Sequence, residues 1–293
     1  MLDVSLCVMN GRSPTPKDDF CTTPLPVPFN EEDFRDERVA QLIFDIEARN
    51  VFLNSATSGP TENSESTAET SSTNILQSVT PNISLYFLCF VDLTLIVRQA
   101  IESLYAPSVA QKPWSEIRTA MTPLNEKADT WLSRLPTAFQ FTLPISDRSF
   151  EKSATSLGLR FYAAKILILQ PCLRRFSKQA SEVQTPGKYC NAMAALCVDA
   201  ACRMLALLPD EPDPALLYRT SPWALVLHYL MQATTVLLMD LFTREESGSE
   251  TCGKVLGAIQ KAVRWLGEMA RMDASSRRAW VVCRDVLSRY SDR

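Results

Sequence analysis

The chain has 293 residues, of which 46% are hydrophobic and 22% charged, so a wholly disordered chain and a coiled-coil rod are both excluded. Its 30 Lys and Arg against 33 Asp and Glu give a net charge of −3, which argues against a surface that binds nucleic acid over its whole extent. With 8 Gly and 1 His, glycine-rich phosphate loops and multi-histidine metal sites are nearly excluded by count.

The N-terminal part of the chain divides into three segments of different composition. Residues 13–33 hold 5 prolines, which fix φ and remove backbone donors, so this segment is predicted to be extended. Residues 31–53 carry apolar side chains at steps of three and four, which predicts one amphipathic helix. Residues 54–74 are rich in Ser and Thr and have no large apolar side chain, so we expect a disordered insert there.

Beyond the insert the apolar periodicity is helical throughout and no segment alternates as a strand would. Pro123 is expected to kink or break its helix and Pro171 to interrupt another, while Thr220 or Ser221 is expected to cap a helix with Pro222 in its first turn. The expected fold is all-α, an irregular array of about eight or nine helices. The predicted helices downstream of the insert are 83–104, 114–135, 157–176, 190–208, 221–242, 254–272 and 275–290.

Two apolar stretches, residues 83–97 and 223–241, approach the length of a membrane span. Asp92 lies in the first, and His228 and Asp240 lie in the second, so we expect core helices and no membrane contact. The 9 cysteines include no CxxC pair, and the N-terminus lacks a secretory pattern. These features predict free thiols in a reducing, intracellular compartment, without a structural zinc site.

The residues also offer little for catalysis. His228 is the one histidine available to activate a nucleophile, and it lies mid-helix among apolar residues without a GxSxG or SxxK motif. The acidic pairs at 18–19 and 31–33 lie in a turn and at a helix start, where they cannot face each other as paired magnesium ligands. We therefore expect no enzyme, and no catalytic residue, cofactor or metal ion in this chain.

Five phrases, taken in order, resemble the middle homology region of fungal zinc-cluster transcription factors. Residues 11–26 (GRSPTPKDDFCTTPLP) resemble its "GRP…D.DCD.PLP" phrase, with Ser13 and Phe20 departing from the pattern. Residues 131–141 are similar to "W…LP…F", and residues 159–171 to "L.YY.A.ILL.RP", with Gln170 in place of the usual Arg. Residues 221–230 resemble "PWW…HYL". The closing helices match at Arg264, Trp265, Leu266, Arg278, Ala279 and Cys283.

The resemblance implies that residues 1–293 form the C-terminal part of a regulatory domain that controls RNA polymerase II transcription in the nucleus without contacting DNA. The zinc cluster itself is missing, so DNA would be reached indirectly or through an absent N-terminal cluster, and zinc is expected only there. Co-regulator proteins, a small-molecule effector and a second copy of the chain are the partners left open. The alternatives are a stand-alone truncated paralogue that acts through partners, or a helical small-molecule-binding protein or enzyme. Among the matched residues, Gly11 is expected to permit a left-handed helix end, and Trp131, Trp223 and Trp265 are expected to be large anchors between helices. The candidate regulatory residues are Gly11, Arg12, Asp18, Pro24, Pro26, Trp131, Tyr162, Pro171, Trp223, His228, Tyr229 and Trp265.

Overall fold

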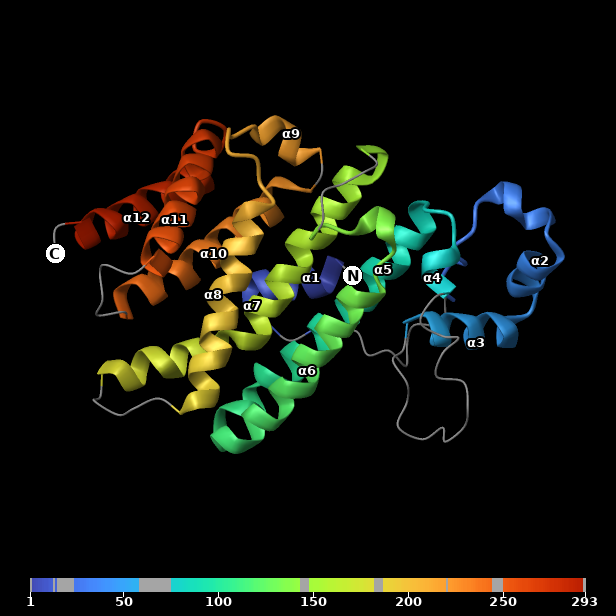
Figure 1. Cartoon of the computed structure of the whole chain (residues 1–293), viewed down its shortest axis with the longest axis horizontal. Coiled ribbons are helices and arrows are strands. Elements are labelled where there is room, and N and C mark those ends of the chain that lie inside the picture. The colour runs from blue at the N-terminus through green and yellow to red at the C-terminus, as the bar shows by residue number, and fades with distance from the viewer. Residues whose placement is uncertain are drawn as a thin grey trace. The chain divides into compact units, whose positions relative to one another are not determined.

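In the computed structural model every regular element of the described residues is a helix (Figure 1). The described residues are 2–12, 14, 24–57, 75–142, 148–181, 187–219, 221–243 and 250–291. The all-α prediction is confirmed, and within these described ranges the ten α-helices of eight residues or more slightly exceed the eight or nine expected. They are α1 (Leu2–Asn10), α2 (Glu37–Phe44), α3 (Ile46–Thr57), α5 (Ile83–Leu104), α6 (Trp114–Arg134), α7 (Glu151–Ser181), α8 (Lys188–Ala206), α10 (Trp223–Thr243), α11 (Glu250–Met269) and α12 (Ala274–Ser291); α4 (Ile75–Ser78) and α9 (Pro214–Tyr218) are shorter.

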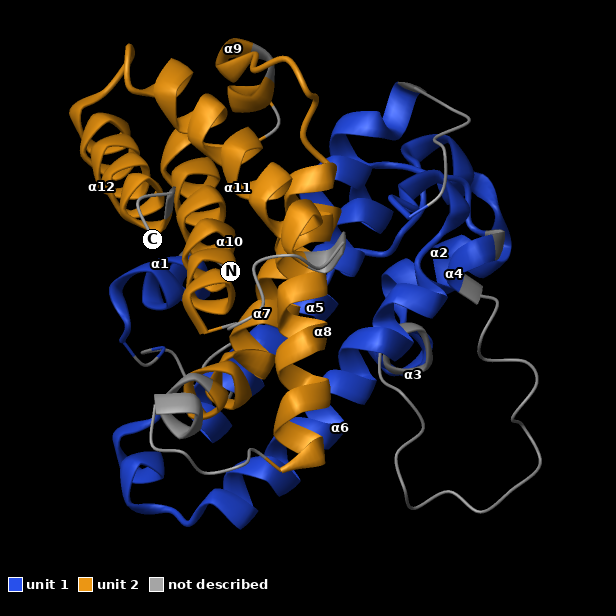
Figure 2. Ribbon diagram, turned by 60° about the vertical axis from the view of Figure 1, so that its left-hand side comes forward, with its two compact units in different colours: residues 1–157 blue, residues 158–293 orange. Residues whose placement is uncertain are grey.

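The chain forms two compact units, residues 1–157 and residues 158–293 (Figure 2). In unit 1, α5 packs along α6 and also contacts α1 and α3. In unit 2, α10 packs between α8 and α11, and α12 lies on α11 and α10. The core side chains recur at steps of three and four because one face of each helix turns inward. Fully buried examples are Leu85, Leu88, Leu93, Met121 and Leu124 in unit 1, and Ile166, Ile168, Leu237, Ile259 and Leu266 in unit 2.

Side-chain caps explain why two of the helices begin where they do. The Asn82 side-chain oxygen accepts the Leu85 backbone N–H at 2.8 Å, which starts α5 at the residue predicted. Asp273 does the same for α12, because its carboxylate accepts the backbone N–H of Ser276 at 2.7 Å and the hydroxyl at 2.6 Å. Polar N-caps thus fix these boundaries locally, before any tertiary contact is considered.

The single helix predicted over residues 31–53 is wrong in its continuity. The segment is a 3₁₀ helix, η2 (Glu31–Arg35), followed by α2 and α3. Asp36 and Asp45 interrupt it because each carboxylate caps the next helix: Asp36 accepts the Arg38 N–H at 2.8 Å, and Asp45 accepts the Glu47 N–H at 2.9 Å. The spacing of the apolar residues continues across both breaks. Periodicity alone therefore predicts one helix where the structure has η2, α2 and α3.

The expected interruption at Pro171 is also wrong, because α7 continues through it to Ser181. Helix α6 runs through Pro123 without a break, and the kink expected there stays a prediction. Around Pro171, Leu169 and Cys172 are fully buried, so tertiary packing offsets the lost backbone hydrogen bond.

Other expectations lie at the edges of the described residues. The sequence did not predict α1, and the first four residues of the expected insert, 54–57, continue α3 instead. The rest of the insert, Asp18 and Thr220 lie outside the described residues. Helix α10 begins at Trp223 after Pro222, and the Ser221 hydroxyl finds no hydrogen-bond partner among the described residues, so Ser221 is not the expected side-chain cap.

Helices α5 and α10 are both long and apolar enough to cross a membrane. The most apolar windows of these helices are 39% and 56% buried inside the protein, respectively. Absence of membrane contact stays a prediction, and the packing of both helices against neighbours is what a core helix would show.

Candidate functional site

The candidate residues of the N-terminal phrase lie at a helix end and in an extended segment. Gly11 has φ +63° and ends α1 in the left-handed conformation that the sequence analysis expected of it. The Arg12 N–H donates to the Cys7 carbonyl at 3.0 Å and the Gly11 N–H to the Val8 carbonyl at 3.5 Å, which together form a Schellman motif. The Arg12 side chain is exposed. Asp18, the acidic candidate of the same phrase, lies outside the described residues.

Pro24 and Pro26 are exposed and lie in a segment without regular structure. This segment is tied to the start of α5, since the Asn82 side-chain amide donates to the Pro28 carbonyl at 3.0 Å. One asparagine therefore caps α5 and holds the proline-rich segment against it. Pro24 and Pro26 restrict the backbone just before this contact, and their side chains carry no chemically reactive group.

Trp131 anchors α6 to α5 in the core of unit 1. Its side chain is 5% exposed, and its indole N–H donates to the Cys89 carbonyl on α5 at 3.0 Å. A tryptophan in this position satisfies its one polar atom while burying a large apolar surface. Trp131 therefore has a packing role, and its buried side chain is not accessible to a ligand in solution.

Tyr162 lies on α7 close to a polar pair on α8. Its side chain is 6% exposed, and its ring packs edge-on against Phe161 with centroids 5.3 Å apart. Burial raises the pKa of Tyr162, an effect opposed by the nearby Arg203 guanidinium. Arg203 is held by Asp199 at 2.6 Å, so the hydroxyl of Tyr162 stays neutral and Arg203 stays charged.

His228 and Tyr229 are neighbours on α10 with different surroundings. The rings meet at a steep angle with centroids 6.0 Å apart, and burial lowers the pKa of His228. The Nε2 atom of His228 and the Oε1 atom of Gln232, one turn later, find no hydrogen-bond partner among the described residues. The Gln232 amide nitrogen donates to the Ala163 carbonyl on α7 at 3.2 Å. The lowered pKa keeps the imidazole neutral at this helix contact.

Tyr229 lines a small apolar hollow in unit 2. The hollow has a volume of about 10 Å³, which is room for roughly one water molecule. A binding site for a small organic molecule needs a cavity of about 300 Å³ or more. The hollow is therefore a packing defect and not a ligand pocket. Its other lining residues are Leu159, Met204, Leu205, Leu208, Val226 and Leu230.

Trp265 and Trp223 show opposite exposure, although the sequence analysis treated both as anchors. Trp265 is 1% exposed and its indole N–H donates to the Pro209 carbonyl at 3.0 Å. One turn earlier on α11, Lys261 pairs with Asp210 at 2.9 Å, so the two side chains hold the loop that follows α8. Trp223 is 46% exposed at the start of α10, so its expected role as a buried anchor is wrong. Its neighbour Pro222 places it on the first helical turn, where the side chain projects outward.

The cysteine side chains have the chemistry of buried apolar groups. Burial raises the pKa of Cys89 and of Cys197 to about 12, with a further contribution from Asp92 to the first and from Cys172 and Asp240 to the second. Protonated thiols are weak metal ligands and poor nucleophiles. Within the described part of the chain no three His, Cys, Asp or Glu side chains come together as a metal site would require.

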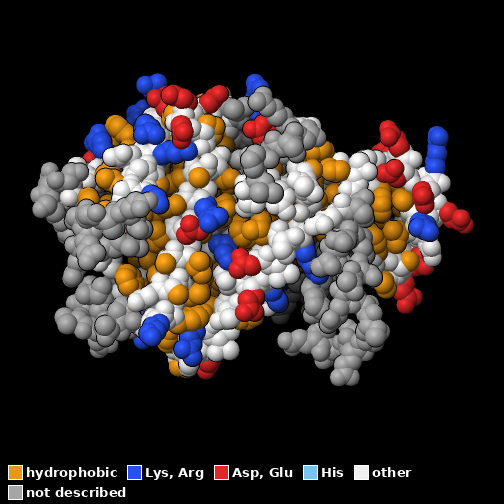
Figure 3. Space-filling model, viewed as in Figure 1, with side chains coloured by type: hydrophobic (Ala, Val, Ile, Leu, Met, Phe, Trp, Pro, Cys, Tyr) orange, Lys and Arg blue, Asp and Glu red, His pale blue; other side chains and the backbone are white. Residues whose placement is uncertain are grey.

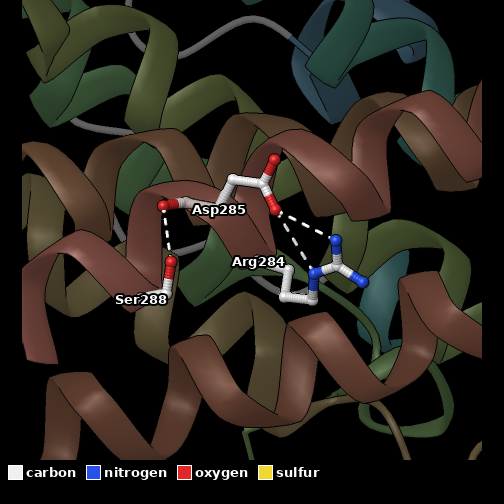
Figure 4. Close-up of polar contacts among 3 residues, drawn as sticks. All are labelled: Arg284, Asp285 and Ser288. Carbon is white, nitrogen blue, oxygen red and sulfur yellow. Dashed lines mark hydrogen bonds and ion pairs between the residues drawn. The ribbon is translucent and has the colours of Figure 1, made fainter.

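The C-terminal helix carries contacts that sequence reasoning missed. The guanidinium of Arg284 lies 4.6 Å from the centre of the Trp280 ring and also bonds to Asp285 at 3.1 Å (Figure 4). The Ser288 hydroxyl donates to the Asp285 carbonyl at 3.0 Å. Gly267 on α11 accommodates the Trp280 indole, whose nitrogen would lie 3.2 Å from an added Cβ. The spacing of Trp280 and Arg284 could have indicated their stacking, whereas the contact between Trp280 and Gly267 joins two helices and has no local signal.

The structure describes eleven of the twelve candidate residues, all but Asp18, and distributes them over both units as helix ends, packing anchors and exposed side chains. In unit 1, Trp131 is buried, while Gly11, Arg12, Pro24 and Pro26 are exposed. In unit 2, Tyr162, Tyr229 and Trp265 are buried, His228 and Pro171 are half-buried, and Trp223 is exposed. Within unit 2, the rings of His228 and Tyr229 meet on α10, and Tyr229 is the candidate residue that lines the small hollow.

These observations define a class: a protein that is all-helical over its described residues, with candidate residues divided between buried packing positions and exposed side chains. Compared with known proteins, the chain is similar to a transcription regulator, galc of Aspergillus niger, with 29% identity over 329 aligned positions that cover 99% of this chain. The chain spans 39% of the length of that relative. No protein-family model matches the chain, and no solved structure matches it.

Proposed function

We propose that this chain regulates transcription as a module that does not itself contact DNA. The observation that carries the proposal is the similarity to the Aspergillus niger transcription regulator, which extends over 99% of the chain. The five ordered phrases of the sequence point to the same class. The chain spans 39% of that relative. From the five ordered phrases, residues 1–293 are proposed to be the C-terminal part of a regulatory domain of the fungal zinc-cluster type.

The chemistry of the candidate residues supports a regulatory role over an enzymatic one. Trp131 and Trp265 use their single polar atoms to join elements, and burial keeps the Cys89 and Cys197 thiols protonated. His228 is held neutral at a helix contact. None of these arrangements supplies an activated nucleophile with a base beside it.

The proposed setting is the nucleus, where the module would control transcription by RNA polymerase II through other proteins. DNA contact would come from a zinc cluster outside this chain or from a partner, and zinc would be held there. The hollow beside Tyr229 is too small for a small-molecule effector, and we propose protein partners as the route of control.

The test is to tether residues 1–293 to a heterologous DNA-binding domain upstream of a reporter gene in a filamentous fungus. A change in reporter output of several-fold or more, in either direction, is the expected result. Trp265→Ala should abolish the change because it removes a fully buried anchor, whereas Trp223→Phe at the exposed tryptophan should preserve it. Equal output from the tethered chain and from the DNA-binding domain alone, at matched protein levels, would refute the proposal.

A further inference from the structure

Apolar side chains project from the junction of α2 and α3 in unit 1. Phe44, the last residue of α2, is 86% exposed, and Ile46, the first residue of α3, is 64% exposed. Val51, further along α3, is 66% exposed. Single exposed apolar residues are ordinary on protein surfaces, but Phe44 and Ile46 flank one residue, Asp45, at the bend between the two helices. We call Phe44 and Ile46, with Asp45 between them and Glu47 after them, the elbow patch; Val51 lies five positions beyond Ile46 and so on another face of α3.

The exposure of the elbow patch follows from a locked backbone. The Asp45 carboxylate accepts the N–H of Glu47 at 2.9 Å and that of Ala48 at 3.1 Å, which caps α3. From the other side, the Arg49 guanidinium donates to the Leu42 carbonyl at 2.9 Å and to the Ile43 carbonyl, which closes the end of α2. The bend is therefore specified on both sides, and it directs Phe44 and Ile46 away from the core.

The opposite side of the same segment is anchored. Val39 and Leu53 are 7% and 5% exposed, and the Phe52 ring lies 6.0 Å from the Phe29 ring. Val39 and Leu53 supply the burial that holds this segment, so the elbow patch is not needed for folding. Apolar side chains that a fold holds outward without using them are candidates for contact with another molecule.

The charge around the elbow patch is strongly acidic. Residues 31–51 contain seven acidic and three basic side chains, a net charge of −4. All seven carboxylates are exposed, and Figure 3 shows acidic and hydrophobic side chains intermingled over this part of unit 1. Arg49 directs its charge to the carbonyls at the end of α2, so it does little to neutralise the surrounding surface.

The negative charge around the elbow patch favours one kind of binding partner over others. An anionic lipid surface would be repelled by a net charge of −4, and a second copy meeting it across a two-fold axis would place carboxylates against carboxylates. A protein groove with an apolar floor would accept the apolar side chains, and a rim of Lys and Arg would attract the surrounding carboxylates.

We propose that the elbow patch docks into a basic-rimmed apolar groove of a co-regulator protein. The proposal deepens the proposed function and rests on it, because it names the surface through which the module would recruit its partner. Phe44 and Ile46 act as the apolar anchors, and the surrounding carboxylates orient the approach and accelerate association.

A first experiment uses a defined probe in place of the co-regulator. The probe is a synthetic helical peptide with a leucine face and a lysine rim, and its partner control has glutamate in place of every lysine. Fluorescence anisotropy of the labelled peptides with residues 1–293 should show binding of the lysine peptide alone. The double variant Phe44→Ala with Ile46→Ala should bind at least tenfold more weakly, as expected from the loss of two anchors.

Ile83→Ala is the matched control, because Ile83 is 85% exposed on α5 of the same unit and lies outside the elbow patch. It should bind the lysine peptide as the unmodified chain does. Equal binding of the glutamate peptide, or an equal loss in Ile83→Ala, would overturn the proposal. Concentration-dependent dimerisation in sedimentation velocity that the double variant abolishes would assign the patch to a second copy and would also overturn it.

The reporter assay separates failure of this proposal from failure of the proposed function. If the tethered chain changes reporter output and the double variant changes it equally, the elbow patch is not the recruiting surface and the regulatory function stands. If the tethered chain has no effect, the regulatory function is refuted, and this proposal, which rests on it, falls as well. The expected result is an effect of the unmodified chain and of Ile83→Ala that the double variant loses at unchanged protein level.

Discussion

Trp265 joins α11 to the loop after α8, and this role can be tested by replacing its side chain with progressively smaller ones. Trp265→Phe keeps most of the ring but removes the indole N–H that reaches the Pro209 carbonyl at 3.0 Å. A neutral hydrogen bond contributes about 0.5–1.5 kcal/mol, and the vacated volume adds about 1 kcal/mol, so about 2 kcal/mol of stability should be lost. Trp265→Ala should cost about 3–5 kcal/mol, because the side chain is 1% exposed and the cavity is large.

The assay is urea unfolding followed by circular dichroism at the helix band. With a slope of about 2–3 kcal/mol per molar for a chain of this size, Trp265→Phe should lower the midpoint of the unit 2 transition by about 0.7–1 M. Trp223→Phe is the control, since Trp223 is 46% exposed and should shift the midpoint by less than about 0.2 M. Equal shifts in the two phenylalanine variants would refute the assignment of Trp265 as an anchor.

Three further predictions concern a titrating carboxyl, a helix end and the thiols. Burial raises the pKa of Asp92 to about 7, partly opposed by Arg134, so the folded chain holds the proton more tightly than the unfolded chain, and stability should fall as pH rises from about 4 to about 7. Asp92→Asn should therefore raise the melting temperature at pH 8 and change it little at pH 4, and a rise of equal size at both pH values would contradict the reasoning. Gly11→Ala should cost about 1 kcal/mol through the φ of +63° and reduce hydrogen-exchange protection in α1, and unchanged protection would show that the left-handed end is not required. Cys89 and Cys197, with pKa values of about 12, should resist iodoacetamide at pH 8 in the native chain and react in 6 M urea, as read by mass spectrometry, and rapid native labelling would show that they are accessible.

The fold was predictable from sequence where a local signal and the tertiary packing agree. Helix α5 was placed at both ends, because Asn82 supplies the cap and the apolar stripe supplies the burial. The α2–α3 bend was missed because Asp36 and Asp45 act through side-chain contacts with the backbone that do not disturb the apolar period. The course of α7 through Pro171 depends on packing partners far along the chain, which no local rule can contain.

The candidate residues also divide into those whose structure follows from a local sequence signal and those whose structure depends on tertiary packing. The conformation of Gly11 follows from glycine chemistry at a helix end, and the burial of Trp131 follows from the apolar stripe of α6. Exposure of Trp223 could not be read from its sequence, because Pro222 makes the side chain part of a first turn whose outward direction depends on the neighbouring helices. The elbow patch was invisible to periodicity, which assigned Ile46 to the buried face of one continuous helix.

The contacts of α11 with the loop after α8 have a consequence for proteolysis. Lys261 and Trp265, one turn apart, hold Asp210 and Pro209, which lie more than fifty positions earlier in the chain. Proteolysis requires local unfolding of the chain, so this proline-containing loop should resist cutting although Asp210 and its neighbours are exposed. Cleavage in this loop would then indicate that α11 has detached from it. The rate of cleavage therefore measures whether unit 2 is folded.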